Sequence, residues 1–98
     1  MRKTKAAGNV FRDIGFRGEE AANLLIRAQL MTVLARFMEE NELKQAQAAK
    51  LFGVSQPRIS DLKRGKIKLF TVDTLIEMLS KAGLDVAVKI SRHQKKAA

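Results

Sequence analysis

The stretch Gln45–Arg64 constrains the fold of this chain more than any other. It predicts two short helices, the first over Gln45–Phe52 and the second beginning at Ser55, with a tight turn at Gly53–Val54 between them. Gly53 can adopt the positive φ that ends the first helix, which most residues adopt only at a cost. The apolar residues recur at the three- and four-residue spacing of a helix face. They are Ala48, Ala49, Phe52, Val54, Ile59 and Leu62.

The residues around the two helix starts refine this prediction. Ser55 is a good N-cap, and Pro57 lies in the first turn of the second helix, where a missing N–H costs little. Lys44 departs from the pattern, because a lysine neither caps a helix nor suits the positive end of its dipole. Two short helices joined in this way are typical of a DNA-binding helix-turn-helix, whose second helix enters the major groove.

Positive charge is concentrated on the same stretch. The chain has a net charge of +9 at pH 7, and residues 44–68 alone carry seven positive charges and one negative charge. The two ends of the chain are also basic, whereas residues 6–43 and 69–90 are slightly acidic. A merely lysine-rich surface would also be basic, but charge that coincides with the motif favours a surface that binds DNA phosphates.

The motif resembles the helix-turn-helix of Xre/Cro family regulators. The residues that carry the resemblance are Gln45, Ala49, Gly53, Val54, Ser55, Gln56, Ile59, Leu62 and Gly65. The layout of residues 10–90 is also similar to the HigA-like antitoxins of type II toxin–antitoxin systems. The resemblance implies a lambda-repressor-like domain that binds DNA and, in the HigA-like group, a toxin.

Composition limits the other possibilities. At 98 residues the chain is predicted to be one small domain that gains stability by dimerising. It has no cysteine, and the single histidine, His93, has no second ligand, so we predict no disulfide, metal site or cofactor. The carboxylates do not converge on one site, so no enzyme activity is predicted. No apolar stretch would span a membrane and no signal peptide follows the basic start, so we expect a cytoplasmic protein.

Residues 19–41 are predicted to form a long helix, whose positive end suits Glu19 and Glu20. Its polar stripe changes sides near Ala28, so one core cannot bury both halves. The first half, with Leu24 and Leu25, faces a second subunit, which we favour, or a toxin partner, or else the helix kinks back. The apolar residues of the second half are expected to bury against the motif. They are Leu30, Val33, Leu34, Phe37 and Met38.

The segment Leu69–Ala82 is predicted to hold the last helix, over residues 72–82, with Thr71 as its N-cap. Residues 84–90 then alternate apolar and polar side chains strictly, which predicts a half-buried β-strand. A lone strand needs a partner. The simplest partner is the same strand of a second subunit, although a toxin strand would also fit.

The remaining segments lie at the two ends of the chain. Residues 1–9 are predicted to be a flexible basic arm, and residues 91–98 a basic tail. The arm either follows the DNA backbone or minor groove or only solubilises the chain, which its composition favours. Phe11, Ile14 and Phe16 are expected to pack on a partner subunit or on the chain's own helices.

Four residues of the second motif helix are candidates for base contact. They are Gln56, Pro57, Ser60 and Asp61. Gln56 opens the helix and can bond adenine N6 and N7, and in the resembled family this position reads bases. Pro57 can contact a thymine methyl group. Asp61 either accepts from cytosine N4 or pairs with Arg58 or Arg64 away from DNA, and we favour the pairing.

Eight residues are predicted to contact phosphates, which carry affinity and salt dependence rather than sequence. They are Lys44, Gln45, Ser55, Arg58, Lys63, Arg64, Lys66 and Lys68. The predicted dimer interface consists of apolar side chains of the strand and of the long helix. They are Leu84, Val86, Val88, Ile90, Leu24 and Leu25.

The predicted fold is a mostly α helix-turn-helix domain of four to five helices, with one C-terminal β-strand that pairs across a dimer. The predicted function is sequence-specific DNA binding by a homodimer at an inverted-repeat operator, which represses transcription. The half-sites should lie about 34 Å apart or a multiple of it. The HigA-like resemblance implies an autorepressing antitoxin that covers a small ribonuclease-type toxin. A phage-type or stand-alone Xre/Cro repressor without a toxin is the alternative.

Overall fold

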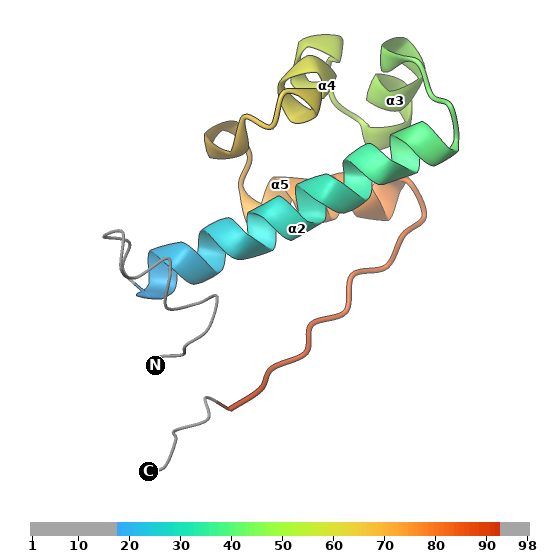
Figure 1. The fold of residues 1–98 in the computed structure, drawn as a ribbon. Coiled ribbons are helices and arrows are strands. Elements are labelled where there is room, and N and C mark those ends of the chain that lie inside the picture. The colour runs from blue at the N-terminus through green and yellow to red at the C-terminus, as the bar shows by residue number, and fades with distance from the viewer. Residues whose placement is uncertain (1–17, 93–98) are drawn as a thin grey trace.

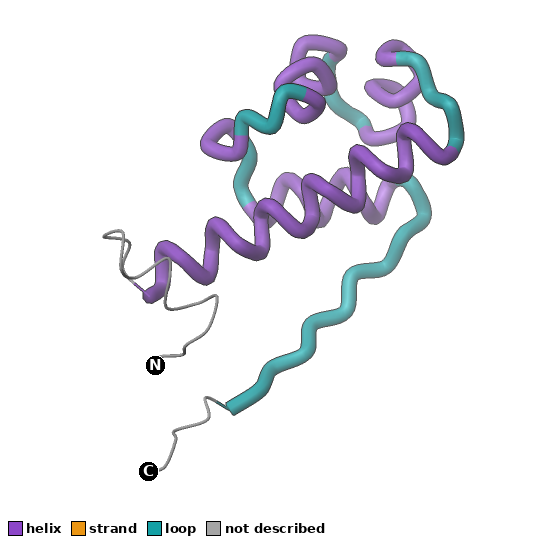
Figure 2. Tube along the Cα trace, in the orientation of Figure 1, coloured by secondary structure: helices purple, strands orange, loops and turns teal. Residues whose placement is uncertain are grey.

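The computed structural model describes residues 18–92, and all regular secondary structure in this range is helical (Figures 1 and 2). The elements are α2 (Gly18–Glu40), α3 (Gln45–Phe52), α4 (Gln56–Lys63), the 3-10 helix η1 (Ile67–Leu69) and α5 (Val72–Lys81). The mostly α helix-turn-helix fold is therefore confirmed. The predictions for the N-terminal arm, for Phe11, Ile14 and Phe16, and for His93 concern residues outside the described range.

α2 is one uninterrupted helix, and the other helices lie along it (Figure 1). The alternative in which this helix kinks back is therefore excluded. Met31, Leu34 and Met38 recur at the three- and four-residue spacing of one face, and all three are buried. The expectation that Val33 is buried was wrong, because its side chain is 45% exposed. It precedes Leu34 by one residue and therefore points about 100° away from the buried face.

The core forms where α3, α4 and α5 meet the second half of α2. α3 packs against α4 and α5, and α5 packs against α2. The rings of Phe37 on α2 and Phe52 on α3 are in contact, with centroids 6.1 Å apart. The buried cluster consists of Met31, Leu34, Met38, Ala48, Ala49, Phe52, Ile59, Leu62, Phe70, Leu75, Met78 and Leu79. Both motif helices are thus fixed to the scaffold by their apolar faces.

The C-terminus of α2 and the N-terminus of α5 are each closed by a specific hydrogen bond. At the end of α2, Glu42 has a φ of +51°, and the following Leu43 donates its N–H to the carbonyl of Met38 at 2.9 Å. This is the left-handed position that commonly closes a helix, and glycine usually occupies it. At the start of α5, the N–H of Thr74 donates to Oγ1 of Thr71 at 3.1 Å, so Thr71 is the N-cap that the sequence predicts.

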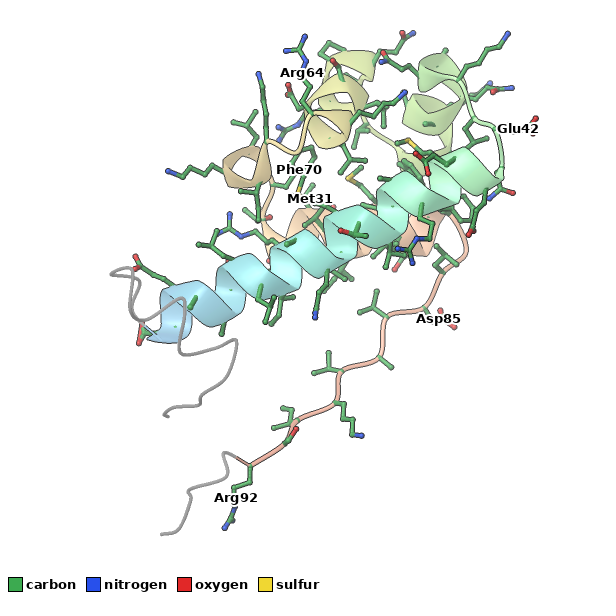
Figure 3. All side chains as sticks on the ribbon, in the orientation of Figure 1. Met31, Glu42, Arg64, Phe70, Asp85 and Arg92 are labelled. Atoms are coloured by element: carbon green, nitrogen blue, oxygen red, sulfur yellow. The ribbon has the colours of Figure 1, made fainter. Side chains whose placement is uncertain are left out.

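The segment after α5 is extended and leaves the helices, as Figure 3 shows between the labelled Asp85 and Arg92. Leu84 still packs against the core, but Val88 is 78% exposed and Ile90 is 87% exposed. No strand partner exists for this segment within residues 18–92. The predicted pairing requires a second chain and stays a prediction. None of the helices in the described range combines the length and the apolar character that a membrane span requires.

Candidate nucleic-acid interface

The turn between α3 and α4 sets the angle at which α4 is presented. Gly53 has a φ of +73°, and Val54 donates its N–H to the carbonyl of Ala49 at 3.0 Å, which closes α3. A Cβ atom on Gly53 would lie 2.7 Å from Cδ of Lys81, a flexible and exposed side chain that can move aside, so it is the positive φ that favours glycine here. Ser55 then returns to an extended conformation and α4 begins.

The helix starts use their polar side chains unequally. The Lys44 side chain makes no cap hydrogen bond, since an ammonium group has no acceptor; instead, the Lys44 N–H donates to Oε1 of Gln47 at 2.8 Å. Ser55 occupies the N-cap position of α4, but its hydroxyl makes no cap hydrogen bond either. Gln45 is exposed at the first position of α3. All three side chains are exposed and therefore remain available to a ligand.

α4 has one buried face and one face open to solvent. Ile59 and Leu62 are buried in the core, whereas Gln56 and Pro57 at its N-terminus are exposed. Ser60 and Asp61 are half-buried. Of the four candidates for base contact, Gln56 and Pro57 are therefore exposed, and Ser60 and Asp61 are only partly accessible.

Asp61 forms an ion pair, but with a residue that the sequence did not indicate. Its Oδ1 lies 3.9 Å from Nζ of Lys66, and no ion pair joins it to Arg58 or Arg64. The chain reverses after α4 at Gly65, whose φ is +72°, and the Lys66 N–H donates to the carbonyl of Asp61 at 3.1 Å. This reversal brings the Lys66 side chain next to Asp61, which explains why the predicted partners were wrong.

Arg58 is held by an aromatic ring. Its guanidinium carbon lies 4.9 Å from the centroid of the Phe70 ring, which is itself almost fully buried. A guanidinium stacked on an aromatic face is stabilised by the ring quadrupole and keeps its N–H donors directed outward. Arg58 is thus half-buried and oriented.

Arg27 on α2 makes a long-range contact with the η1 segment that the sequence did not indicate. One terminal nitrogen, Nη1, donates to the carbonyls of Ile67 and Phe70, at 3.2 Å each. Its Nε is buried and has no hydrogen-bond partner among the described residues. The accepting carbonyls lie 40 and 43 residues further along the chain, so no local pattern could indicate this contact.

The remaining candidates differ in exposure. The basic side chains at the end of α4 and around η1 are exposed, and Figure 3 shows the labelled Arg64 on the side of α4 away from α2. These side chains are Lys63, Arg64, Lys66 and Lys68. In the predicted dimer interface, Leu24 and Leu84 are half-buried, and the other four are exposed: Leu25, Val86, Val88 and Ile90.

A short helix, a glycine turn and a second helix with an exposed polar start, flanked by exposed basic residues, define the helix-turn-helix class of DNA-binding proteins. The chain belongs to the helix-turn-helix domain family, whose sequence model matches residues 10–91. It is also similar to a solved structure titled "Putative XRE Family Transcriptional Regulator". The two share 28% sequence identity, with a TM-score of 0.71 over 81% of this chain and 89% of that one. A comparison with curated proteins finds no match.

Proposed function

We propose that the protein is a sequence-specific repressor that inserts the N-terminus of α4 into the major groove of an operator. One observation carries this proposal: α4 is anchored by Ile59 and Leu62 while Gln56 and Pro57 remain exposed. A reading helix needs both properties, since its buried face fixes the register and its polar start must reach base edges. The similar XRE regulator supports a role in transcription.

The residues that we assign to base contacts and to phosphate contacts differ in their side-chain chemistry. Gln56 has the paired donor and acceptor that match adenine N6 and N7, and Pro57 offers an apolar ring to a thymine methyl group. The basic side chains at the end of α4 and around η1 neutralise phosphates, together with Gln45, Lys44 and Ser55 at the helix starts. With its carboxylate paired to Lys66, Asp61 contributes to the shape of the surface rather than to base contact.

The decisive experiment compares binding of the wild-type protein and Gln56→Ala to the protein's own upstream DNA and to scrambled DNA. Loss of a bidentate base contact costs about 1–3 kcal/mol of discrimination, so the preference of the variant for the upstream DNA should fall by a factor of about 5 to 150. The dependence of affinity on salt should stay unchanged, because the phosphate contacts remain.

Gln29→Ala provides a matched control, because Gln29 is also exposed but lies on α2. This variant should retain the wild-type preference. If Gln56→Ala keeps the full preference of the wild type, α4 does not read bases through this residue and the proposal fails.

We further propose that the repressor acts as a homodimer on an inverted repeat, and that residues 84–90 pair with the same segment of a second copy. The strict alternation, the extended backbone and the exposed apolar side chains of Val88 and Ile90 support this pairing. A two-fold axis there would present the two α4 helices to successive turns of the major groove, and a dimer on the operator would block polymerase.

The same segment favours a second candidate function, that of an autorepressing antitoxin. An exposed extended segment can also add to the sheet of a partner, here a small ribonuclease-type toxin. Co-purification with the product of a neighbouring short reading frame would support this role. If the protein binds its operator and no such partner co-purifies, the stand-alone repressor is the correct description.

A further inference from the structure

The loop that follows α4 makes side-chain contacts with two helices, with α4 at its start and with α2 at its end. At its start, the carboxylate of Asp61 lies 3.9 Å from the Lys66 ammonium group. At its end, Nη1 of Arg27 donates to the carbonyls of Ile67 and Phe70. Lys68 lies between those two carbonyls in the sequence, so Arg27 holds the backbone on both sides of it. This loop carries two of the exposed lysines of the candidate interface.

Arg27 also supports the reading helix indirectly. It fixes the backbone of Phe70, whose buried ring lies under the guanidinium group of Arg58. A chain of contacts therefore runs from α2 through Phe70 to a cation on α4. Both the loop lysines and Arg58 depend on the same backbone segment, and Arg27 holds it from the scaffold side.

Stability alone does not explain why residue 27 is an arginine and not an apolar residue. Its Nε is buried without a partner, and a buried donor that lacks a partner is costly. An apolar side chain would fill the same space without that cost, although it would remove the donor that the carbonyls of Ile67 and Phe70 share. An arginine nevertheless offers what an apolar residue cannot, namely one planar group that bonds two carbonyls and fixes their separation.

We propose that Arg27 is a positioning residue for DNA binding: it acts through the η1 loop to hold Lys66 and Lys68 where they meet phosphates. This inference rests on the proposed function. A loop that is already ordered loses less conformational entropy on binding, so the free energy of the phosphate contacts appears as affinity.

The test measures DNA affinity of the full chain across salt concentrations for the wild type and Arg27→Met. Each phosphate contact contributes about 0.9 to the slope of log affinity against log salt concentration. We therefore expect a slope shallower by roughly one to two and an affinity about tenfold lower at low salt. Arg36→Met is the control, since Arg36 is an exposed arginine of the same helix, and it should keep the wild-type slope.

A double-mutant cycle separates positioning from direct contact. If Arg27 acts through the two lysines, Arg27→Met should change the slope little in a background that already carries Lys66→Gln and Lys68→Gln. Additive effects would show that Arg27 acts independently of the lysines and would overturn the inference. A wild-type slope for Arg27→Met would overturn it as well.

Circular dichroism of each variant separates positioning from loss of fold, because a smaller folded fraction lowers affinity equally at all salt concentrations. Should Arg27→Met not fold, Lys66→Gln combined with Lys68→Gln takes its place: a wild-type slope for this pair would show that the two lysines meet no phosphates and would overturn the inference. If the wild type itself shows no salt-dependent DNA binding, the proposed function fails and the inference with it.

Discussion

Glu42 lies at the end of α2 in a conformation that suits glycine better than glutamate. Its φ of +51° brings the side chain close to its own backbone, and this costs about 1–2 kcal/mol in L-residues. Its side chain is exposed, as Figure 3 shows for the labelled residue. The position is therefore one where a change of residue type should act mainly through the backbone.

We expect Glu42→Gly to raise the free energy of unfolding by about 0.5–1 kcal/mol, because relief of the left-handed strain exceeds the added entropy of a glycine in the unfolded chain. Urea unfolding followed by circular dichroism measures it. Glu39→Gly is the control, since the same change inside the helix should lower stability by about 1 kcal/mol. Equal destabilisation of the two variants would contradict this account of Glu42.

The exposure and the partners of a residue were predictable where they depend on a single helix. The exposure of Gln56 follows from its place at the first position of α4, one turn before the first buried residue, Ile59. The partner of Asp61 did not follow, because a turn after the helix supplies it. The hydrogen bonds of Arg27 could not be predicted, because its partners are backbone carbonyls, which every residue has and which carry no sequence signal.

At the scale of elements, the two capping residues Thr71 and Ser55 behave differently. The hydroxyl of Thr71 accepts a hydrogen bond from the first turn of α5, whereas Ser55 makes no such bond in α4. Both residues occupy the N-cap position of their helix. Their contributions to stability should therefore differ although the sequence signals look alike.

Thr71→Ala should lower the free energy of unfolding by about 1 kcal/mol, the usual value of an N-cap oxygen. Ser55→Ala should change it by less than about 0.5 kcal/mol, as is usual for exposed positions without such a bond. Thr71→Ser keeps the oxygen and is expected to keep most of the stability. Thermal unfolding of the three variants gives the comparison. If Ser55→Ala proves as costly as Thr71→Ala, capping does not distinguish the two helices.

Helices with clear caps and apolar spacing were the easiest elements to predict. The motif helices have both, since glycine, serine and proline mark their ends and the buried positions recur regularly. η1 was not predicted, because a turn of three residues is too short to show periodicity. The two-sided pattern of α2 showed correctly that one core does not cover it. Of the residues expected to bury, Leu34 and Met38 are buried, whereas Val33 is exposed.

At the scale of the molecule, the proposed dimer depends on a segment that contributes little to the fold of one chain. Val88 and Ile90 are among the most exposed apolar side chains described, so replacing them should leave the helical domain intact. They lie on the same face of the extended segment, as the alternation requires. Their effect should therefore appear in the association state and not in the stability of the monomer.

We expect Val88→Asp combined with Ile90→Asp to abolish the dimer in sedimentation experiments while the helical circular dichroism spectrum stays unchanged, since a charge opposite its own copy opposes pairing. Ala87→Asp combined with Ser91→Asp adds the same charge to the opposite face and should leave the dimer intact. A dimer that survives the first pair of changes would locate the two-fold axis elsewhere, with Leu25 on α2 as the next candidate.

The extended segment after α5 also bears on how long the protein survives. Beyond Leu84, no described backbone group in this segment donates a hydrogen bond to the helices. Exposed segments near chain ends are preferred sites of proteolytic cleavage. Pairing with a second copy would cover the same peptide bonds, so a monomer would be degraded faster than a dimer. The lifetime of the protein would then increase with its own concentration, and dilution by cell growth would be followed by accelerated removal.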